Sequence, residues 1–253
     1  MRKLPPPQAE LALGNHDRER GQTAAGRLKG EAVVKPRVIE TTEGIQGEFD
    51  VIAYDRMMRR LRDRGWIETS EILKAGITNG VALEIGPGPG YLGLDWLSKT
   101  EEASLVGLEI SANMTAMAER NAQEVGLSER VNYVHGDACK MPFEDETFNA
   151  VFTNGSLHEW AEPLAILNEI ARVLKPGGRY CVSDLRRDMN PLLKGLMWAF
   201  THPKVMRAGL ISSINAAYIE QELRELVARS ELDHPQIKKS VIGLAVIGKK
   251  GDS

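Results

Sequence analysis

The stretch Val81-Ala-Leu-Glu-Ile-Gly-Pro-Gly-Pro-Gly90 decides the fold of this chain. Its first half is a short apolar run interrupted by one acid, Glu84, as expected for a strand buried within a parallel sheet. The alternating glycines that follow allow the backbone to turn sharply and to approach a ligand closely. A helical pattern begins near Tyr91. The stretch therefore predicts a strand, a tight turn that cradles a nucleotide-like molecule, and a helix.

The glycines fit two spacings. Dinucleotide-binding turns use Gly-x-Gly-x-x-Gly directly after the strand, with an acid about 20 residues later. Gly88, Gly90 and Gly93 have that spacing, but it starts two residues beyond the end of the predicted strand. The spacing acid-x-Gly-x-Gly-x-Gly, formed by Glu84, Gly86, Gly88 and Gly90, begins at the strand end and resembles the first motif of class I S-adenosylmethionine-dependent methyltransferases. An NAD(P)-dependent oxidoreductase is the alternative that the first spacing leaves open.

Further segments follow in the order that this family has, over residues 80–185. They are the strands and following turns in Leu105–Ser111, Val131–Ala138 and Phe148–His158, and the helix, turn and strand in Glu169–Tyr180. The resemblance implies an α/β fold with a doubly wound seven-stranded sheet, mostly parallel with one antiparallel strand. It also implies N-terminal helices and a helical lid around this Rossmann-like core.

The resemblance implies a binding site for S-adenosylmethionine, with S-adenosylhomocysteine as the product. Glu109 lies 23 residues after Gly86, where a carboxylate can accept hydrogen bonds from both ribose hydroxyls. Asp137 matches the acid that reaches the adenine amino group. A solvated strand end for Glu109 and a helix N-cap for Asp137 are the alternatives. The predicted cofactor-binding residues are Tyr54, Glu84, Gly86, Pro87, Gly88, Gly90, Glu109, Ile110, Met114, Asp137, Ala138, Asn154, Gly155 and Ser156.

Two residues are predicted to be catalytic, His158 and Tyr54. His158 follows the fourth strand, which in this family ends beside the methyl group, and histidine accepts a proton near its ordinary pKa of about 6.5. Tyr54 lies in the predicted N-terminal helix, from which it would reach the methionine end of the cofactor. A wall residue for His158 and simple packing for Tyr54 are the alternatives. Asp184 is expected either to face the pocket or to pair with Arg186 or Arg187.

Composition narrows the class of acceptor. The net charge of −3 disfavours a nucleic-acid partner, because such partners are bound mainly through phosphates. The loop Asn154-Gly-Ser-Leu157 differs from the Asn/Asp-Pro-Pro-aromatic loop of enzymes that methylate base nitrogens. We therefore expect a small acceptor, which can be apolar and whose attacking atom is oxygen, nitrogen, sulfur or carbon. A non-catalytic relative that only binds the cofactor is a further alternative.

The chain is expected to be a cytoplasmic protein without a membrane span. It has no segment of about 18 consecutive apolar residues, and its two cysteines, Cys139 and Cys181, indicate reduced thiols rather than disulfides. Neither cysteine has a partner at metal-ligand spacing, so no metal site is predicted. A homodimer is compatible with the sequence.

The predicted organisation is a weakly ordered N-terminal extension, residues 1–40, followed by a methyltransferase domain, residues 41–253. Within that domain, residues 41–78 form a helical cap and residues 189–215 a helical lid insertion. Several apolar residues of the lid, from Leu192 to Phe200, fall on one helical face. Such a face can serve as a lid over the substrate, as plain core or as dimer packing.

Overall fold

A computed structural model describes residues 35–38 and 47–252 of the chain. Most of the predicted extension, residues 1–34 and 39–40, therefore lies outside the described residues, as do the first residues of the predicted cap, 41–46. The division into extension, cap and lid stays a prediction. In the part of the chain that the structure describes, no helix is long and apolar enough to cross a bilayer.

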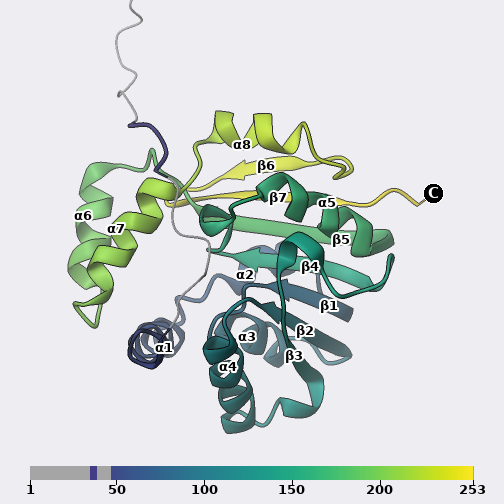
Figure 1. The fold of residues 1–253 in the computed structure, drawn as a ribbon, viewed down its shortest axis with the longest axis horizontal. Coiled ribbons are helices and arrows are strands. Elements are labelled where there is room, and N and C mark those ends of the chain that lie inside the picture. The colour runs from purple at the N-terminus through teal and green to yellow at the C-terminus, as the bar shows by residue number, and fades with distance from the viewer. Residues whose placement is uncertain (1–34, 39–46, 253) are drawn as a thin grey trace, which may run out of the picture. The chain divides into compact units, whose positions relative to one another are not determined.

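One seven-stranded sheet forms the centre of the fold, with strand order β3-β2-β1-β4-β5-β7-β6 (Figure 1). Its strands are β1 Gly80–Ile85, β2 Ala103–Glu109, β3 Val131–His135, β4 Phe148–Asn154, β5 Leu174–Leu185, β6 Gln236–Lys239 and β7 Gly243–Lys249. The first five strands pair in parallel, whereas β7 runs antiparallel to both β5 and β6. The predicted fold class is confirmed, including the single antiparallel strand.

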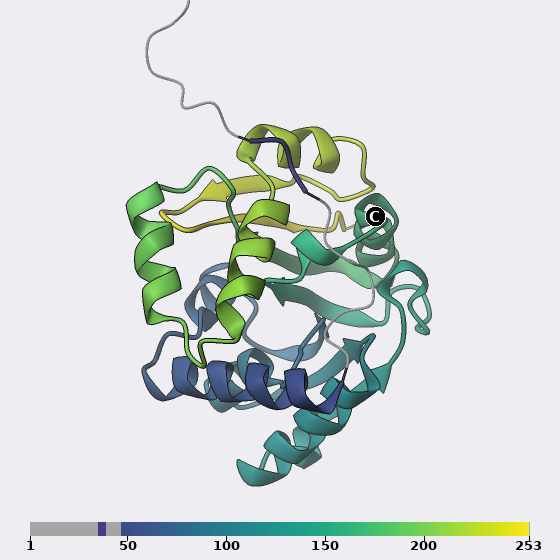
Figure 2. The ribbon, with the colours of Figure 1, turned by 60° about the vertical axis from the view of Figure 1, so that its left-hand side comes forward.

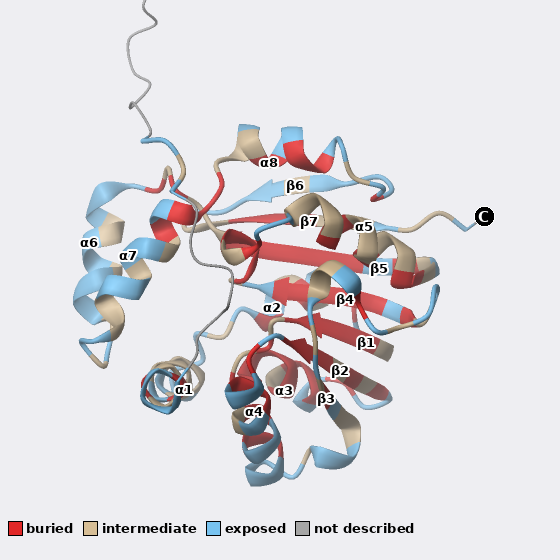
Figure 3. Cartoon of the chain, viewed as in Figure 1, coloured by how far each residue is buried: buried red, intermediate tan, exposed pale blue. Residues whose placement is uncertain are grey.

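Helices cover both faces of the sheet. They are α1 Glu48–Asp63, α2 Thr69–Lys74, α3 Tyr91–Ser98, α4 Ala112–Glu124, α5 Pro163–Val173, α6 Pro191–Phe200, α7 Met206–Ala216 and α8 Glu220–Val227, with the single turns η1 Ser128–Arg130, η2 Ala138–Lys140 and η3 Leu157–Glu159. Successive strand residues point to opposite faces, so Leu83 and Ile85 pack with α5 and α8. Ala82, the residue before Leu83, points to the other face and packs with α2 and α3. Figure 3 shows the central strands β1, β4 and β5 as the most deeply buried elements, whereas the edge strand β6 is largely exposed.

Two elements differ from their predicted bounds. The pattern of residues 131–138 predicts a strand that ends in Asp137, but β3 ends at His135, because the carboxylate of Asp137 accepts a hydrogen bond from the Cys139 amide and starts η2. The N-cap alternative for Asp137 is therefore the local structure. The turn predicted before the fifth strand lies inside β5, where the pairing with β4 shifts register. Gly177 has a φ of 75° there, a value that glycine adopts without strain.

The helices α6 and α7 lie side by side (Figure 2) and contact each other. No residue of α6 is buried, so core packing of its apolar face, one of the predicted alternatives, is not what the described residues show. The other helix, α7, contacts α1 and η3. The pair thus reaches the rest of the fold mainly through α7.

Candidate cofactor and active site

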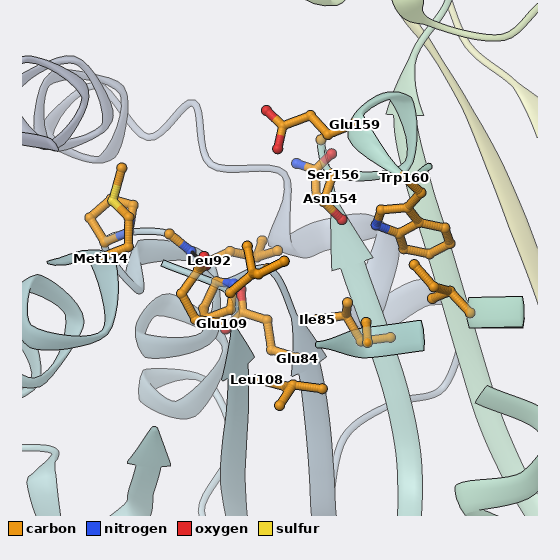
Figure 4. Close-up of a pocket in the computed structure, with 18 of the residues that line it drawn as sticks. Glu84, Ile85, Leu92, Leu108, Glu109, Met114, Asn154, Ser156, Glu159 and Trp160 are labelled. Carbon is orange, nitrogen blue, oxygen red and sulfur yellow. Dashed lines mark hydrogen bonds between the residues drawn. The ribbon is translucent and has the colours of Figure 1, made fainter. Parts of the chain in front are cut away.

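A pocket of about 600 Å³ opens at the carboxyl ends of the central strands. The strand order reverses between β1 and β4, and open α/β sheets bind ligands at such switch points. Figure 4 shows Glu84, Glu109 and Met114 toward one side of the pocket and Asn154, Glu159 and Trp160 toward the other. Residues from five separate segments therefore meet in one cleft.

The turn after β1 needs glycine at alternate positions. Gly86, Gly88 and Gly90 have φ values of 63°, 53° and 85°, in the left-handed region that side chains disfavour. The Gly86 amide donates to the carbonyl of Leu108 at 2.9 Å, which joins the turn to β2. A Cβ on Gly90 would lie 2.5 Å from the hydroxyl of Tyr133. The turn is thus fixed by its backbone conformation and by its hydrogen bond to β2, and at Gly90 the neighbouring Tyr133 also leaves no room for a side chain.

Glu109 lies at the end of β2 with both carboxylate oxygens engaged. Its Oε2 accepts the Gly88 amide at 3.0 Å, and its Oε1 accepts the Ser111 amide at 2.9 Å. Only 5% of the residue is exposed, so it is not a solvated strand end. Burial raises the pKa of Glu109, and the two amides act in the opposite direction. Each carboxylate oxygen has a second lone pair, so the fixed carboxylate can still accept hydrogen bonds from a ligand.

Glu84 lines the same pocket and is more deeply buried, with 1% of the residue exposed. Burial is the main reason that its pKa rises to about 8, and the negative charge of Glu109 adds to the rise. Its Oε2 is buried and has no hydrogen-bond partner among the described residues. A buried carboxyl oxygen without a partner is unfavourable, so this atom is suited to a ligand that brings a donor or a positive charge.

Position 93 requires glycine because α3 packs closely against the sheet there. A Cβ there would lie 2.2 Å from Glu84 Oε2 and 2.3 Å from Leu105 Cδ2. The third glycine of dinucleotide-binding turns also serves close helix–strand packing. Helix packing therefore explains why glycine occupies the third position of the dinucleotide-binding spacing, and Gly93 does not indicate a nicotinamide cofactor.

Asp55, which sequence analysis missed, fixes α1 against the glycine turn. Its Oδ1 accepts hydrogen bonds from the Tyr91 hydroxyl at 2.8 Å and from Asn121 Nδ2 at 2.9 Å. Asn121 Nδ2 also donates to the carbonyl of Pro89 within the turn, at 2.9 Å. Asp55 is only 7% exposed. The one signal in the sequence is an acid on the apolar side of a helix, and α1 carries several other acids that are solvated.

Tyr54, the neighbour of Asp55, lines the pocket. Its Cε1 lies 3.4 Å from where a Cβ on Gly88 would be. Burial raises the pKa of Tyr54, and the negative charges of Glu159 and Glu109 add to the rise. The phenol therefore stays protonated at neutral pH and can donate a hydrogen bond but not act as a base.

His158 lies behind the pocket wall, in η3. It is 4% exposed, and its Nδ1 lies 2.9 Å from Asp184 Oδ2. Its backbone amide also donates to Asp184 Oδ2, at 2.7 Å. Asp184 thus pairs with neither of the arginines considered for it, which bind Asp188 and Glu222 instead. On the other side, His158 Nε2 lies 3.8 Å from Oε1 of Glu159, which does line the pocket.

The structure brings almost all the predicted cofactor residues together. Every one of them lines the pocket except Gly90, which caps α3. The pocket also has an apolar wall that sequence analysis did not assign to a site, with Met58, Leu61 and Trp66 among its residues. In the described ranges, no group of three or more His, Cys, Asp or Glu side chains could hold a metal ion.

Arg37, upstream of α1, contacts the back of the site. Its Nε donates to the carbonyl of Ala216 at 2.5 Å, and its Nη2 donates to the carbonyl of His158 at 3.1 Å. The guanidinium also lies 4.2 Å from the ring centroid of Tyr218, within range of a cation–π contact. Arg37 therefore joins η3 to the segment between α7 and α8.

Comparisons with known proteins agree with this geometry. The family model described as "Methyltransferase domain" matches residues 83–182. A demethylmenaquinone methyltransferase from Lactiplantibacillus plantarum is 32% identical over 168 residues, which cover 62% of this chain and 69% of the relative. A demethylmenaquinone methyltransferase from Roseiflexus castenholzii is 31% identical over 172 residues, covering 66% of this chain and 71% of the relative.

A solved structure has the same fold. It is a SAM-dependent methyltransferase from Aquifex aeolicus, with a TM-score of 0.56 and 18% identity, covering 72% of this chain and 89% of the other. The oxidoreductase alternative is not supported, because the family match and these relatives are methyltransferases. The chain belongs to the class I S-adenosylmethionine-dependent methyltransferases, in their small-molecule branch.

Proposed function

We propose that this methyltransferase binds S-adenosylmethionine in the pocket at the ends of β1, β2 and β4 and methylates a small, apolar, quinone-like acceptor. The observation that carries the cofactor site is the hydrogen bond from the Gly88 amide to Glu109 Oε2, at 3.0 Å, on the pocket wall. The acceptor class is supported by the two relatives, both demethylmenaquinone methyltransferases.

The residues present fit the cofactor. Glu109 offers a fixed carboxylate for the ribose hydroxyls, and Asp137 and Ala138 line the part of the pocket beside it. The buried Oε2 of Glu84, for which the described part of the chain offers no hydrogen-bond partner, suits the positive charge of the amino-acid end. Asn154, Gly155 and Ser156 line the opposite wall after β4. We assign these residues to cofactor binding.

Methyl transfer requires the protein chiefly to align the acceptor with the methyl group and to exclude water. The sulfonium of the cofactor supplies an electrophilic methyl group. The pocket walls must hold the acceptor in line with it, and alignment of this kind lowers a barrier by about 7–11 kcal/mol. Trp160, Ile166 and Leu185 line the pocket with apolar surface, which excludes water from the reacting atoms. Tyr54, kept protonated, orients groups by donating its hydroxyl hydrogen.

An acceptor that arrives protonated also needs a base. Glu159 is the pocket carboxylate that lies beside His158, which lies behind it with Asp184 beyond. Asp184 favours the tautomer of His158 with its proton on Nδ1, which leaves Nε2 facing Glu159 as an acceptor. We assign to Glu159 the removal of the acceptor's proton and to His158 Nε2 the relay step in which it takes that proton from Glu159, giving an imidazolium whose charge is balanced by Asp184. His158 therefore contributes to base catalysis only through Glu159.

We also propose that the protein is cytoplasmic and that its acceptor is a small molecule. Burial raises the pKa of the Cys139 thiol to about 11 and that of Cys181 to about 12. Both thiols are therefore protonated at neutral pH and unreactive, as suits a protein whose cysteines serve packing. A homodimer remains part of the proposal only as one compatible assembly.

Two measurements test the function. Calorimetric titration with S-adenosylhomocysteine should show binding in the wild-type protein and weaker binding in Glu109→Ala. Incubation with a deuterated-methyl donor and a short-chain demethylmenaquinone should then give a product that carries the label, read by mass spectrometry. Binding without transfer to this acceptor or to any molecule of a cell extract would favour the non-catalytic relative. Absence of binding would refute the assigned cofactor site.

A further inference from the structure

The helix α6 exposes apolar side chains on almost all of its surface. Its ten residues include one charged residue, Lys194, and none of the ten is buried. A helix that is apolar on all sides is normally buried. The exposed fractions of its large side chains are 74% for Leu192, 47% for Leu196, 44% for Trp198 and 65% for Phe200. These four residues, together with Val205 (53% exposed) in the following turn, are called the α6–α7 face below.

The charged residues within the two helices and the turn between them have one sign. Residues 189–219 include Lys194, Lys204 and Arg207 but no aspartate or glutamate, in a chain whose net charge is −3. Lys204 is exposed in the turn between the two helices. The guanidinium of Arg207 lies 4.3 Å from the ring centroid of Trp198, and its Nη2 donates to the carbonyl of Ala199 at 2.8 Å. Apolar and cationic groups are therefore presented together.

We infer that the α6–α7 face docks on the surface of a lipid bilayer that contains anionic headgroups. Helices that lie in a membrane interface combine Trp, Phe and Leu on the buried side with lysine and arginine near the headgroups. Each lysine or arginine near an anionic surface contributes attraction that salt screens. Tryptophan prefers the level of the headgroups, where Arg207 beside Trp198 would meet phosphates.

Other occupants fit the face less well. A symmetric contact with a second copy of the chain brings the same patch to itself, so Lys204 and Arg207 would meet cations like themselves. Residues 1–34 carry six lysines and arginines and four acids, so their net charge has the same sign as the face. An anionic surface is the partner for which both the apolar and the charged groups are complementary.

Docking through this face would bring the pocket close to the bilayer. The helix α7 contacts α1 and η3, which carry the pocket residues Tyr54 and Glu159. The inference goes beyond the proposed function and does not depend on which acceptor is methylated, because vesicle binding is measured without cofactor or acceptor.

Flotation of the full chain with vesicles tests the inference. The protein should float with vesicles of phosphatidylcholine mixed with phosphatidylglycerol, more weakly with phosphatidylcholine alone, and less as salt rises. The double variant Leu192→Gln/Leu196→Gln should bind about tenfold more weakly, a difference of about 1.4 kcal/mol. The matched control is Val125→Gln, at the end of α4, because Val125 is 46% exposed and Leu196 47%. Its binding should match that of the wild type.

A second variant keeps the test decisive if the double variant fails to fold, as judged by loss of S-adenosylhomocysteine binding. Lys204→Gln removes an exposed charge and should weaken binding to the anionic vesicles about fivefold, with little change on phosphatidylcholine. Failure of the wild type to float with anionic vesicles would overturn the inference. So would equal losses in the Val125→Gln control, or a dimer in sedimentation that the double variant dissociates.

Discussion

Replacement of Gly93 by alanine should destabilise the protein, although alanine is the better helix former. In an unobstructed helix the change would raise the free energy of unfolding by up to about 1 kcal/mol. Here the added Cβ would lie 2.2 Å from Glu84 Oε2 and 2.3 Å from Leu105 Cδ2. Those residues are 1% and 2% exposed, so neither side chain can move into solvent. Overpacking of this kind lowers stability by about 1–3 kcal/mol, and we expect a net loss of about 1–2 kcal/mol.

Urea unfolding followed by circular dichroism measures this loss. The control is Gly209→Ala in α7, where a Cβ would have no atom within 4 Å. This substitution should stabilise the protein by about 0.5–1 kcal/mol. Because displacement of Glu84 disturbs the pocket, Gly93→Ala should also weaken S-adenosylhomocysteine binding, whereas the control should not. A Gly93→Ala protein as stable as the wild type, with unchanged affinity, would refute the close packing of α3 on Glu84.

Three further changes probe the site. Glu109→Ala should weaken S-adenosylhomocysteine binding by about 1–3 kcal/mol, because hydroxyls buried with the ligand lose their acceptor; unchanged affinity in calorimetry would remove Glu109 from the site. Glu84 has a pKa of about 8 in the fold against an ordinary value of 4.5, so the folded state binds more protons and ligand-free stability should fall as pH rises between these values. Unfolding across that range should be less pH-dependent in Glu84→Gln, and an unaltered slope would contradict the shift. His158→Ala should lower turnover more than cofactor affinity, and a wild-type rate would exclude the relay.

Much of the pocket proposed for the cofactor could be predicted because its residues follow strand ends. Glycine spacing after an apolar run located the turn, and the distance from Gly86 to Glu109 placed the acid at the next strand end. Parallel strands end at one edge of the sheet, so local patterns are enough to bring these residues together. The hydrogen bond between Gly88 and Glu109 shows that residues with this spacing meet in the fold.

The environment of His158 could not be predicted in this way. Its position behind the wall depends on Asp184, which lies on the neighbouring strand and accepts both its amide and its Nδ1 proton. The pairing register of β4 with β5 decides that meeting, and a register shift lies at the start of this pairing. Asp55 escaped notice for a similar reason, because its partners come from α3 and α4.

The extent of α6 followed from its helical periodicity, but its surroundings did not. The apolar face was expected to meet a lid site, a core or a dimer partner. Leu192 and Phe200 are among the most exposed large apolar residues that the structure describes, which rules out only the core alternative. Periodicity reports which residues share a side of a helix and contains no information about what that side meets.

The contacts of Arg37 affect the choice of the domain boundary when a chimeric enzyme is built from this chain and a relative. Similarity to the methyltransferase domain family begins at residue 83, and a boundary chosen there would discard the cation that clamps the backbone of His158 from behind. Arg187 Nε likewise donates to the carbonyl of Lys35 at 2.8 Å. A chimera that retains the relay geometry should therefore inherit the short peptide from residue 35 onward along with the sheet.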